Sequence, residues 1–140
     1  MKISDVMSRD VQVARPDDTL QSVAQRMAEA DIGSLPVEDG GRIIGMVTDR
    51  DIVVRGVAKG VEAGATISQV MSSEVTCCRA DDDLEDVSDK MADAQVRRLP
   101  VLDDGGRLVG VVALGDLARK DEAKRTGRTL EQISEPSRPS

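Results

Sequence analysis

The chain contains the same unit twice, and this internal repeat restricts its fold more than any other feature. The segment 45–51, Gly-Met-Val-Thr-Asp-Arg-Asp, returns 65 positions later as Gly-Val-Val-Ala-Leu-Gly-Asp at 110–116. An extra residue in the second copy lies beside Gly105 and Gly106, where a turn can absorb it. A period of this length predicts two copies of one supersecondary unit. Further matches pair 6–8 with 70–72, and 35–37 with 99–101.

Each copy is predicted to run strand, helix, hairpin, helix. In the first copy, residues 11–13 are β-prone, and an apolar helical face follows from Leu20, capped by Asp17 or Asp18 with Gln21 completing a capping box. Gly33 is expected to end that helix. The remaining elements are strands at 35–37 and 43–47 and a helix from about Arg50. The second copy repeats the order with strands at 75–77, 99–102 and 108–112 and helices at 84–94 and from about 115.

Composition limits the size of the core. The chain has 140 residues and no Phe, Tyr or Trp, so the core must be aliphatic. Half a chain of this kind is marginally stable alone. We therefore expect the repeats to bury apolar faces against each other, and the protein to form a homodimer.

Charge and residue usage exclude several classes of function. A net charge of −7 argues against nucleic-acid binding, and the chain has no aromatic ring on which a base could stack. With no histidine, a His-based triad and most zinc sites are excluded, and no metal site is expected. No nucleophile lies beside a visible base, so we expect no enzyme activity. The N-terminus lacks a signal-peptide pattern and no segment is apolar enough for a membrane span, which favours a cytoplasmic protein without membrane contact.

Cys77 and Cys78 are adjacent and are the only cysteines. Neighbouring side chains on a strand point to opposite faces, which disfavours a disulfide between them. One buried and one exposed free thiol is the simpler interpretation, and a thiol-based redox sensor is the alternative.

The repeated motifs resemble a known family. Both copies carry, in order, Met-Ser, Asp-Asp-x-Leu, Leu-Pro-Val, Asp-Gly-Gly-Arg-x-x-Gly-x-Val and Asp. This order resembles a tandem pair of cystathionine-β-synthase (CBS) domains, a Bateman module, of the small stand-alone bacterial type. The resemblance covers about 2–118. It divides the chain into repeat 1 at 2–58, a connector at 59–66, repeat 2 at 67–120, and a charged helix end with a flexible tail at 121–140.

The resemblance implies an α/β (α+β) fold of two β-α-β-β-α repeats, packed through their sheets about a pseudo-two-fold axis. In the family, clefts between such repeats bind adenosine-containing ligands such as AMP, ADP, ATP or S-adenosylmethionine. The implied function is a non-catalytic sensor of an adenine nucleotide, which signals to an unknown protein partner by a conformational or dimer change. A CBS protein with empty clefts and a purely structural or protein-interaction role is the alternative.

The family's ribose-binding signature falls on Gly45, Met46, Val47, Thr48 and Asp51. A carboxylate at a helix start can accept two ribose hydroxyls, and a threonine can contact ribose or phosphate. Gly45 would admit a ligand or another backbone, and exposed helix N–H groups would favour phosphate. Alternatively, Thr48 and Asp51 merely cap the helix.

The second copy differs at several of these positions. It keeps Asp116 as a candidate ribose ligand, but Ala113 replaces the threonine. It also has Arg97 and Arg98 where the first copy has Gly33 and a serine. In family members such as the γ subunit of AMP-activated protein kinase, basic residues there can face phosphates, and guanidiniums suit that role. A salt-bridged surface pair is the alternative.

Aliphatic side chains are the candidates for contact with the adenine, because no aromatic is present. Ordinary core packing is the alternative for all of them. They are Val11, Val13, Ile44 and Met46.

Overall fold

The computed structural model describes residues 1–117, which form two compact units. The repeat-one unit comprises Gln12–Val75 and Gly106–Leu108. The repeat-two unit comprises Met1–Val11, Thr76–Gly105 and the chain from Val109. Each unit therefore contains most of one repeat together with the first residues of the other repeat.

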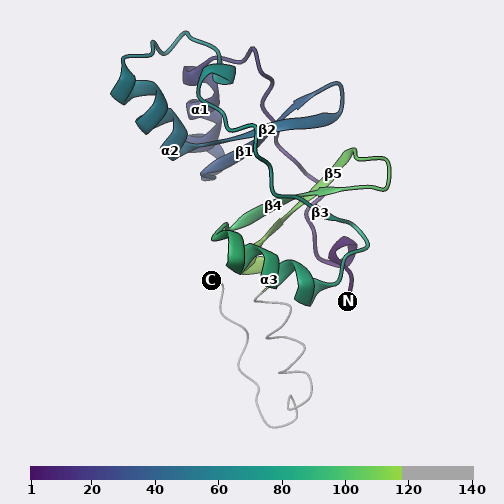
Figure 1. Cartoon of the computed structure of the whole chain (residues 1–140). Helices are drawn as coiled ribbons and strands as arrows, with labels where there is room; N and C mark the ends of the chain where they lie inside the picture. The colour runs from purple at the N-terminus through teal and green to yellow at the C-terminus, as the bar shows by residue number, and fades with distance from the viewer. Residues whose placement is uncertain (118–140) are drawn as a thin grey trace. The chain divides into compact units, whose positions relative to one another are not determined.

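The repeat-one unit is built on an antiparallel hairpin (Figure 1). Its strands pair Leu35 with Val47 and Val37 with Gly45, which confirms the predicted hairpin. Leu20, Val23 and Met27 of the first helix are buried in an aliphatic core with Leu35 and Val37. The elements of this unit are α1 (Leu20–Ala30), β1 (Ser34–Asp39), β2 (Arg42–Thr48), α2 (Asp49–Asp51), a π-helical turn (Ile52–Gly56) and 3-10 turns at Val57–Lys59 and Ile67–Gln69.

Helix α1 has different ends from those predicted. Thr19 is the N-cap, and its hydroxyl accepts the backbone N–H of Ser22 at 3.1 Å. The predicted cap at Asp17 or Asp18 with Gln21 is wrong, because the Asp18 carboxylate instead accepts the Arg15 N–H at 2.9 Å. The helix ends at Ala30, and its C-cap Asp31 adopts the left-handed conformation with φ 54°, so the predicted end at Gly33 is wrong.

The predicted strand at 11–13 does not form. Only Ala14 bridges β1: its N–H donates to the Pro36 carbonyl at 2.8 Å, and its carbonyl accepts the Glu38 N–H at 2.9 Å. The Val13 carbonyl is occupied by the guanidinium of Arg26 at 2.5 Å. In the parallel register of this bridge, a longer strand would need an N–H from Pro36, which has none.

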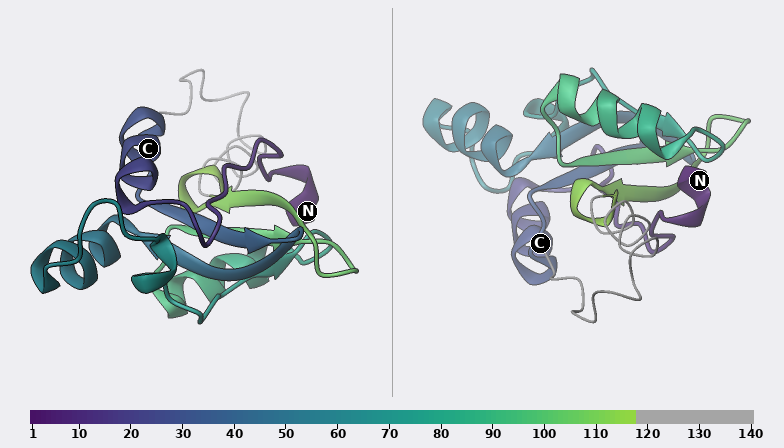
Figure 2. Two further views of the ribbon diagram at one scale, coloured as in Figure 1. Left: turned by 90° about the horizontal axis from the view of Figure 1, so that it is seen from above. Right: turned by 90° about the horizontal axis from the view of Figure 1, so that it is seen from below.

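The repeat-two unit contains a three-stranded sheet in the order β3-β4-β5, with β3 parallel to β4. Figure 2 shows α3 lying along this sheet, where Val87 and Met91 pack with Leu99 and Val101. The predicted helix at 84–94 and strands at 99–102 and 108–112 are confirmed, whereas the strand expected at 75–77 lies further along the chain. The elements are a 3-10 turn (Ile3–Asp5), β3 (Cys78–Arg79), α3 (Leu84–Ala94), β4 (Arg98–Leu102) and β5 (Leu108–Ala113).

The first residues of each repeat complete the core of the unit formed mainly by the other repeat. Ile3 is fully buried in the core of the repeat-two unit, and Ile67 is fully buried in that of the repeat-one unit. Ser8 pairs with Val111 and Ser72 pairs with Met46 in matching antiparallel bridges. The compact units therefore differ from the repeats as they are written in the sequence.

No helix within residues 1–117 is long and apolar enough to cross a membrane. The predicted helix end and tail at 121–140 lie outside the described residues.

Candidate functional site

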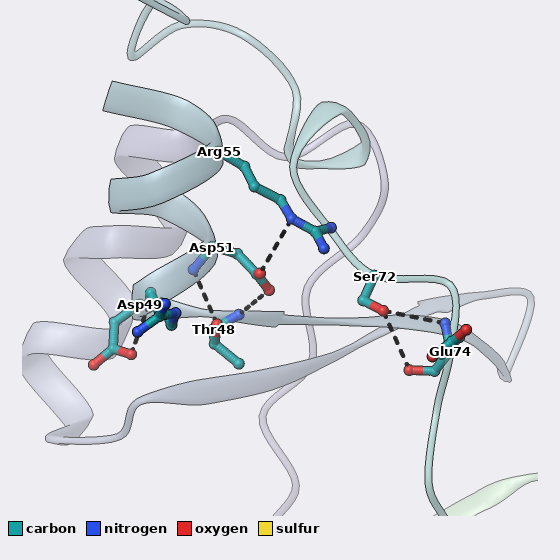
Figure 3. Close-up of polar contacts among 7 residues, drawn as sticks. Thr48, Asp49, Asp51, Arg55, Ser72 and Glu74 are labelled. Carbon is teal, nitrogen blue, oxygen red and sulfur yellow. Dashed lines mark hydrogen bonds and ion pairs between the residues drawn. The ribbon is translucent and has the colours of Figure 1, made fainter. Parts of the chain in front are cut away.

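The candidate site is the junction where β2 ends and α2 begins, here called the β2–α2 junction and comprising residues 45–51. Thr48 is the N-cap of α2. Its hydroxyl accepts the Asp51 N–H at 3.0 Å, and the Asp51 carboxylate accepts the Thr48 N–H at 3.0 Å (Figure 3). The two predicted ribose ligands thus form a capping box, which fixes both side chains at the start of the helix.

Arg55 is a further member of the site that the sequence interpretation missed. Its Nε lies 3.8 Å from Oδ1 of Asp51, and Figure 3 shows this nitrogen facing the carboxylate. The Asp51 side chain is 17% exposed and that of Arg55 is 51% exposed. A carboxylate offers about four acceptor positions, so Asp51 retains capacity for a ligand hydroxyl. The acid–base spacing of four residues was the signal in the sequence.

The backbone N–H groups at this helix start already have acceptors. Besides the two of the capping box, Asp49 donates its N–H to the Gly33 carbonyl at 2.9 Å. The N–H of Arg50 donates to the Asp49 carboxylate at 2.8 Å. The expectation of exposed N–H groups for a phosphate is therefore wrong at this helix, because the protein's own oxygens satisfy all four.

Gly45 makes room for backbone. A Cβ at this position would lie 2.6 Å from the Ser72 carbonyl oxygen and 3.1 Å from Sδ of Met71. Met46 and Ser72 exchange N–H···O bonds of 2.9 and 2.8 Å. Of the two roles expected for Gly45, the structure shows the close approach of another backbone.

The corresponding junction in the repeat-two unit follows β5. Gly110 again admits a neighbouring backbone, since a Cβ there would lie 2.8 Å from the Ser8 carbonyl oxygen. Leu114 donates its N–H to the Arg97 carbonyl at 2.7 Å, in the way that Asp49 bonds Gly33. Asp116 is half-buried.

Arg97 and Arg98 lie at the start of β4, where Arg97 is exposed and Arg98 is half-buried. Neither guanidinium forms an ion pair with a carboxylate of residues 1–117. The salt-bridged alternative is therefore not found in the described part of the chain.

The four candidate adenine contacts are all half-buried. Ile44 and Met46 both lie on β2, where Ile44 is the extra residue of a β-bulge between the pairs Val37–Gly45 and Glu38–Ile43. Ile44 packs against the repeat-one core. Val13 belongs to the same unit, whereas Val11 belongs to the repeat-two unit.

Both cysteines are free thiols, with Cys78 buried and Cys77 half-buried. Burial raises the pKa of Cys78 to about 12, and its Sγ donates to the Pro100 carbonyl at 3.7 Å. Burial also raises the pKa of Cys77, against the opposing charge of Lys90. Little reactive thiolate forms at neutral pH, which disfavours the redox-sensor alternative.

Two small α/β units from one duplicated sequence, each with a glycine that admits a backbone and an aspartate after the second hairpin strand, define a tandem-repeat module. The chain belongs to the CBS domain family, because the CBS domain model matches residues 3–56 and 67–122.

Relatives of similar length support this assignment. The chain is 40% identical over 133 residues to the CBS domain-containing protein YhcV of Bacillus subtilis, covering 94% of each chain. It is 38% identical over 117 residues to hypoxic response protein 1 of Mycobacterium tuberculosis, covering 82% of this chain and 81% of that protein.

Solved structures of CBS proteins share the fold. Hypoxic Response Protein I, solved with two coordinated zinc ions, matches with a TM-score of 0.77 at 37% identity, covering 85% of this chain and 98% of that one. The CBS domain pair of MJ0100, in complex with 5′-methylthioadenosine and S-adenosyl-L-methionine, matches with a TM-score of 0.77 at 26% identity, covering 89% and 98%. Within residues 1–117 of this chain, no three His, Cys, Asp or Glu side chains are grouped to hold a metal ion.

Proposed function

We propose that the protein is a non-catalytic regulatory module that binds an adenosine-containing ligand, such as AMP, ADP, ATP or a related adenosine derivative. The observation that carries this proposal is the Asp51 carboxylate, which is fixed at the β2–α2 junction and keeps free acceptor capacity. The likeness to the MJ0100 pair, whose structure holds two adenosine derivatives, supports the same ligand class.

In this proposal, the ribose hydroxyls donate to Asp51, and Thr48 adds a hydroxyl whose hydrogen remains free to donate. The Thr48 oxygen already accepts the Asp51 N–H. Ile44 and Met46, which are both half-buried on β2, contribute apolar contact for the adenine. In the repeat-two unit, Asp116 takes the ribose role, and Arg97 and Arg98 provide charge for ligand phosphates.

Binding regulates an unknown protein partner in the cytoplasm by shifting the population of two conformations or dimer arrangements. Such a shift requires a ligand that binds one state more tightly than the other. No covalent chemistry is involved.

A purely structural CBS protein is the second candidate, and one observation favours it. The capping box accounts for both Thr48 and Asp51 without any ligand. Both candidates predict that removal of the Asp51 side chain lowers stability, but only the first predicts ligand binding that this removal weakens.

Asp51→Ala tests the proposal by isothermal titration calorimetry with adenosine, AMP, ADP, ATP and S-adenosylmethionine. We expect binding at the β2–α2 junction to weaken by about 1.5–3 kcal/mol, the range for hydrogen bonds to a charged group. The lost capping box should also lower the free energy of unfolding by about 0.5–2 kcal/mol.

Thr19→Ala is the matched control, because it removes the comparable N-cap of α1. It should lower stability by a similar amount and leave the affinity unchanged. If Asp51→Ala lowers stability but leaves binding intact, Asp51 only caps the helix and does not contact the ligand. Absence of binding to any of these ligands at millimolar concentration contradicts the proposed function.

A further inference from the structure

The two units share one backbone hydrogen bond, but the residues that form it carry charges of opposite sign. Asp49 donates its N–H to the Gly33 carbonyl, and Leu114 donates its N–H to the Arg97 carbonyl. In the first pair, Gly33 has no side chain and Asp49 is an anion. In the second pair, Arg97 is a cation and Leu114 is apolar. Each pair thus places one charged group at its junction, and the two groups differ in sign.

The Asp49 carboxylate lies against the position that a side chain at residue 33 would occupy. A Cβ on Gly33 would lie 3.2 Å from Oδ2 of Asp49. Gly33 has no positive φ that would require glycine for backbone reasons. The absence of a side chain at residue 33 therefore leaves the space beside the Asp49 carboxylate open.

A phosphate finds few free hydrogen-bond donors and little positive charge at the β2–α2 junction. The N–H groups of residues 48–51 are already bonded to protein oxygens. Two carboxylates, Asp49 and Asp51, lie within the first turn, and Arg55 is paired with Asp51. A 5′ substituent is at most about a ribose width from a sugar bound at Asp51, so it lies within the Debye length of about 8 Å from these charges.

We propose that Asp49 is a specificity-determining residue that makes the β2–α2 junction select adenosine derivatives whose 5′ substituent is neutral or cationic over those with a 5′-phosphate. A neutral thioether or a cationic sulfonium at the 5′ position meets no repulsion from Asp49 and Asp51. A dianionic phosphate meets repulsion from both, and Arg50 is the one remaining cation of that turn. The repeat-two junction, with Arg97 and Arg98, then takes phosphorylated ligands.

The experiment replaces Gly33 and Asp49 at the β2–α2 junction of the full-length protein by the residue types of Arg97 and Leu114. Since the assignment rests on the proposed adenosine-binding function, the titrants are adenosine, 5′-methylthioadenosine and AMP. Each is titrated into the wild type and into Gly33→Arg/Asp49→Leu by calorimetry. Adding Asp51→Ala to each protein identifies the binding that belongs to the β2–α2 junction.

In the wild type, we expect 5′-methylthioadenosine binding to depend on Asp51 and AMP binding to be independent of it. In the double variant, AMP should gain Asp51-dependent affinity of at least about tenfold, while 5′-methylthioadenosine changes less than about threefold. Asp49→Asn, which keeps an oxygen for the Arg50 N–H, should give a smaller gain in the same direction without remodelling the junction.

Asp39→Arg is the charge-matched control. It also shifts the net charge by two, but the register places it at the far end of the hairpin from Thr48. It should leave the selectivity unchanged.

Tight, Asp51-dependent AMP binding to the wild type would overturn the role of Asp49. So would unchanged selectivity in both Asp49 variants, provided that thermal unfolding shows them folded. A wild type that binds none of the three ligands contradicts the proposed function itself, which distinguishes the two failures.

Discussion

At the scale of single residues, two glycines determine which segments can pair. Gly45 and Gly110 occupy equivalent positions on β2 and β5, and each admits the backbone of a Met-Ser segment from the other repeat. Without a Cβ, the carbonyl oxygens of Ser72 and Ser8 can approach these strands. The glycines of the ribose signature therefore stabilise the fold of each unit.

Gly45→Ala should destabilise the protein by about 1–3 kcal/mol, the usual cost of an overpacked core position. The added methyl group would lie 2.6 Å from the Ser72 oxygen, and backbone cannot move aside cheaply. Urea unfolding measures the change. Gly64→Ala is the control, because a Cβ there meets nothing within 4 Å. Equal midpoints for the two variants would contradict this role of Gly45.

Cys78 should make stability depend on alkaline pH. Its pKa rises from an ordinary value of 9.0 to about 12 in the folded protein, mainly through burial. Above pH 9 the unfolded chain loses the thiol proton and the folded protein keeps it, so the free energy of unfolding should fall as pH rises from about 9 to 12. Urea unfolding across this range measures the slope. Cys78→Ala should flatten it more than Cys77→Ala, and equal slopes in all three proteins would contradict the prediction.

The polar residues of the site could be predicted, but their partners could not. Thr48 and Asp51 stand out because their types and spacing fit both a ribose signature and a capping box. The sequence does not show that the Gly33 carbonyl takes the Asp49 N–H, because these residues are brought together by the β1–β2 register. The loss of free N–H groups for a phosphate therefore became visible only in the structure.

At the scale of elements, strongly periodic segments were predicted well and their ends poorly. Helix α3 was predicted at its observed bounds because Val87 and Met91 mark its buried face. The cap of α1 was misplaced because Asp17, Asp18 and Thr19 all carry suitable oxygens. Only the backbone path selects Thr19. The strand at 11–13 failed because the register set by Ala14 would need an N–H from Pro36 to extend the pairing, and proline has none.

Ile3 and Ile67 should each stabilise the unit formed mainly by the other repeat. Ile3→Ala removes a fully buried side chain from the core around α3, and Ile67→Ala does the same to the core around α1. Each should cost about 2–5 kcal/mol. Amide hydrogen exchange should show lost protection in α3 for Ile3→Ala and in α1 for Ile67→Ala.

The two variants serve as controls for each other in that experiment. Equal loss of protection in both helices for either variant would show that the units unfold as one. Lost amide protection only in α1 for Ile3→Ala, or only in α3 for Ile67→Ala, would contradict the placement of each isoleucine in the core of the other unit.

At the scale of the whole molecule, duplication produced two units whose junctions share a backbone contact and differ in the charged residues beside it. The repeat could be recognised from the sequence. The sequence did not show that the first residues of each repeat complete the core of the other unit. Ile3 and Ile67 are the same residue type at matching positions, so the sequence does not show which core each one enters. The same duplication allowed the two junctions to differ, with Asp49 in one and Arg97 and Arg98 in the other.

We predict that the protein forms a homodimer through the helical segment Ile52–Lys59. Val53 is 58% exposed, Val54 44% and Val57 69%, and such clustered apolar side chains are typical of interaction surfaces. Association with a second copy would remove them from water. Sedimentation should show a dimer that Val53→Lys/Val57→Lys converts to a monomer. Glu62→Lys, which changes the net charge equally, is the control and should remain dimeric. A monomeric wild type at about 100 μM would contradict the dimer, and a dimeric double variant would assign it to another surface.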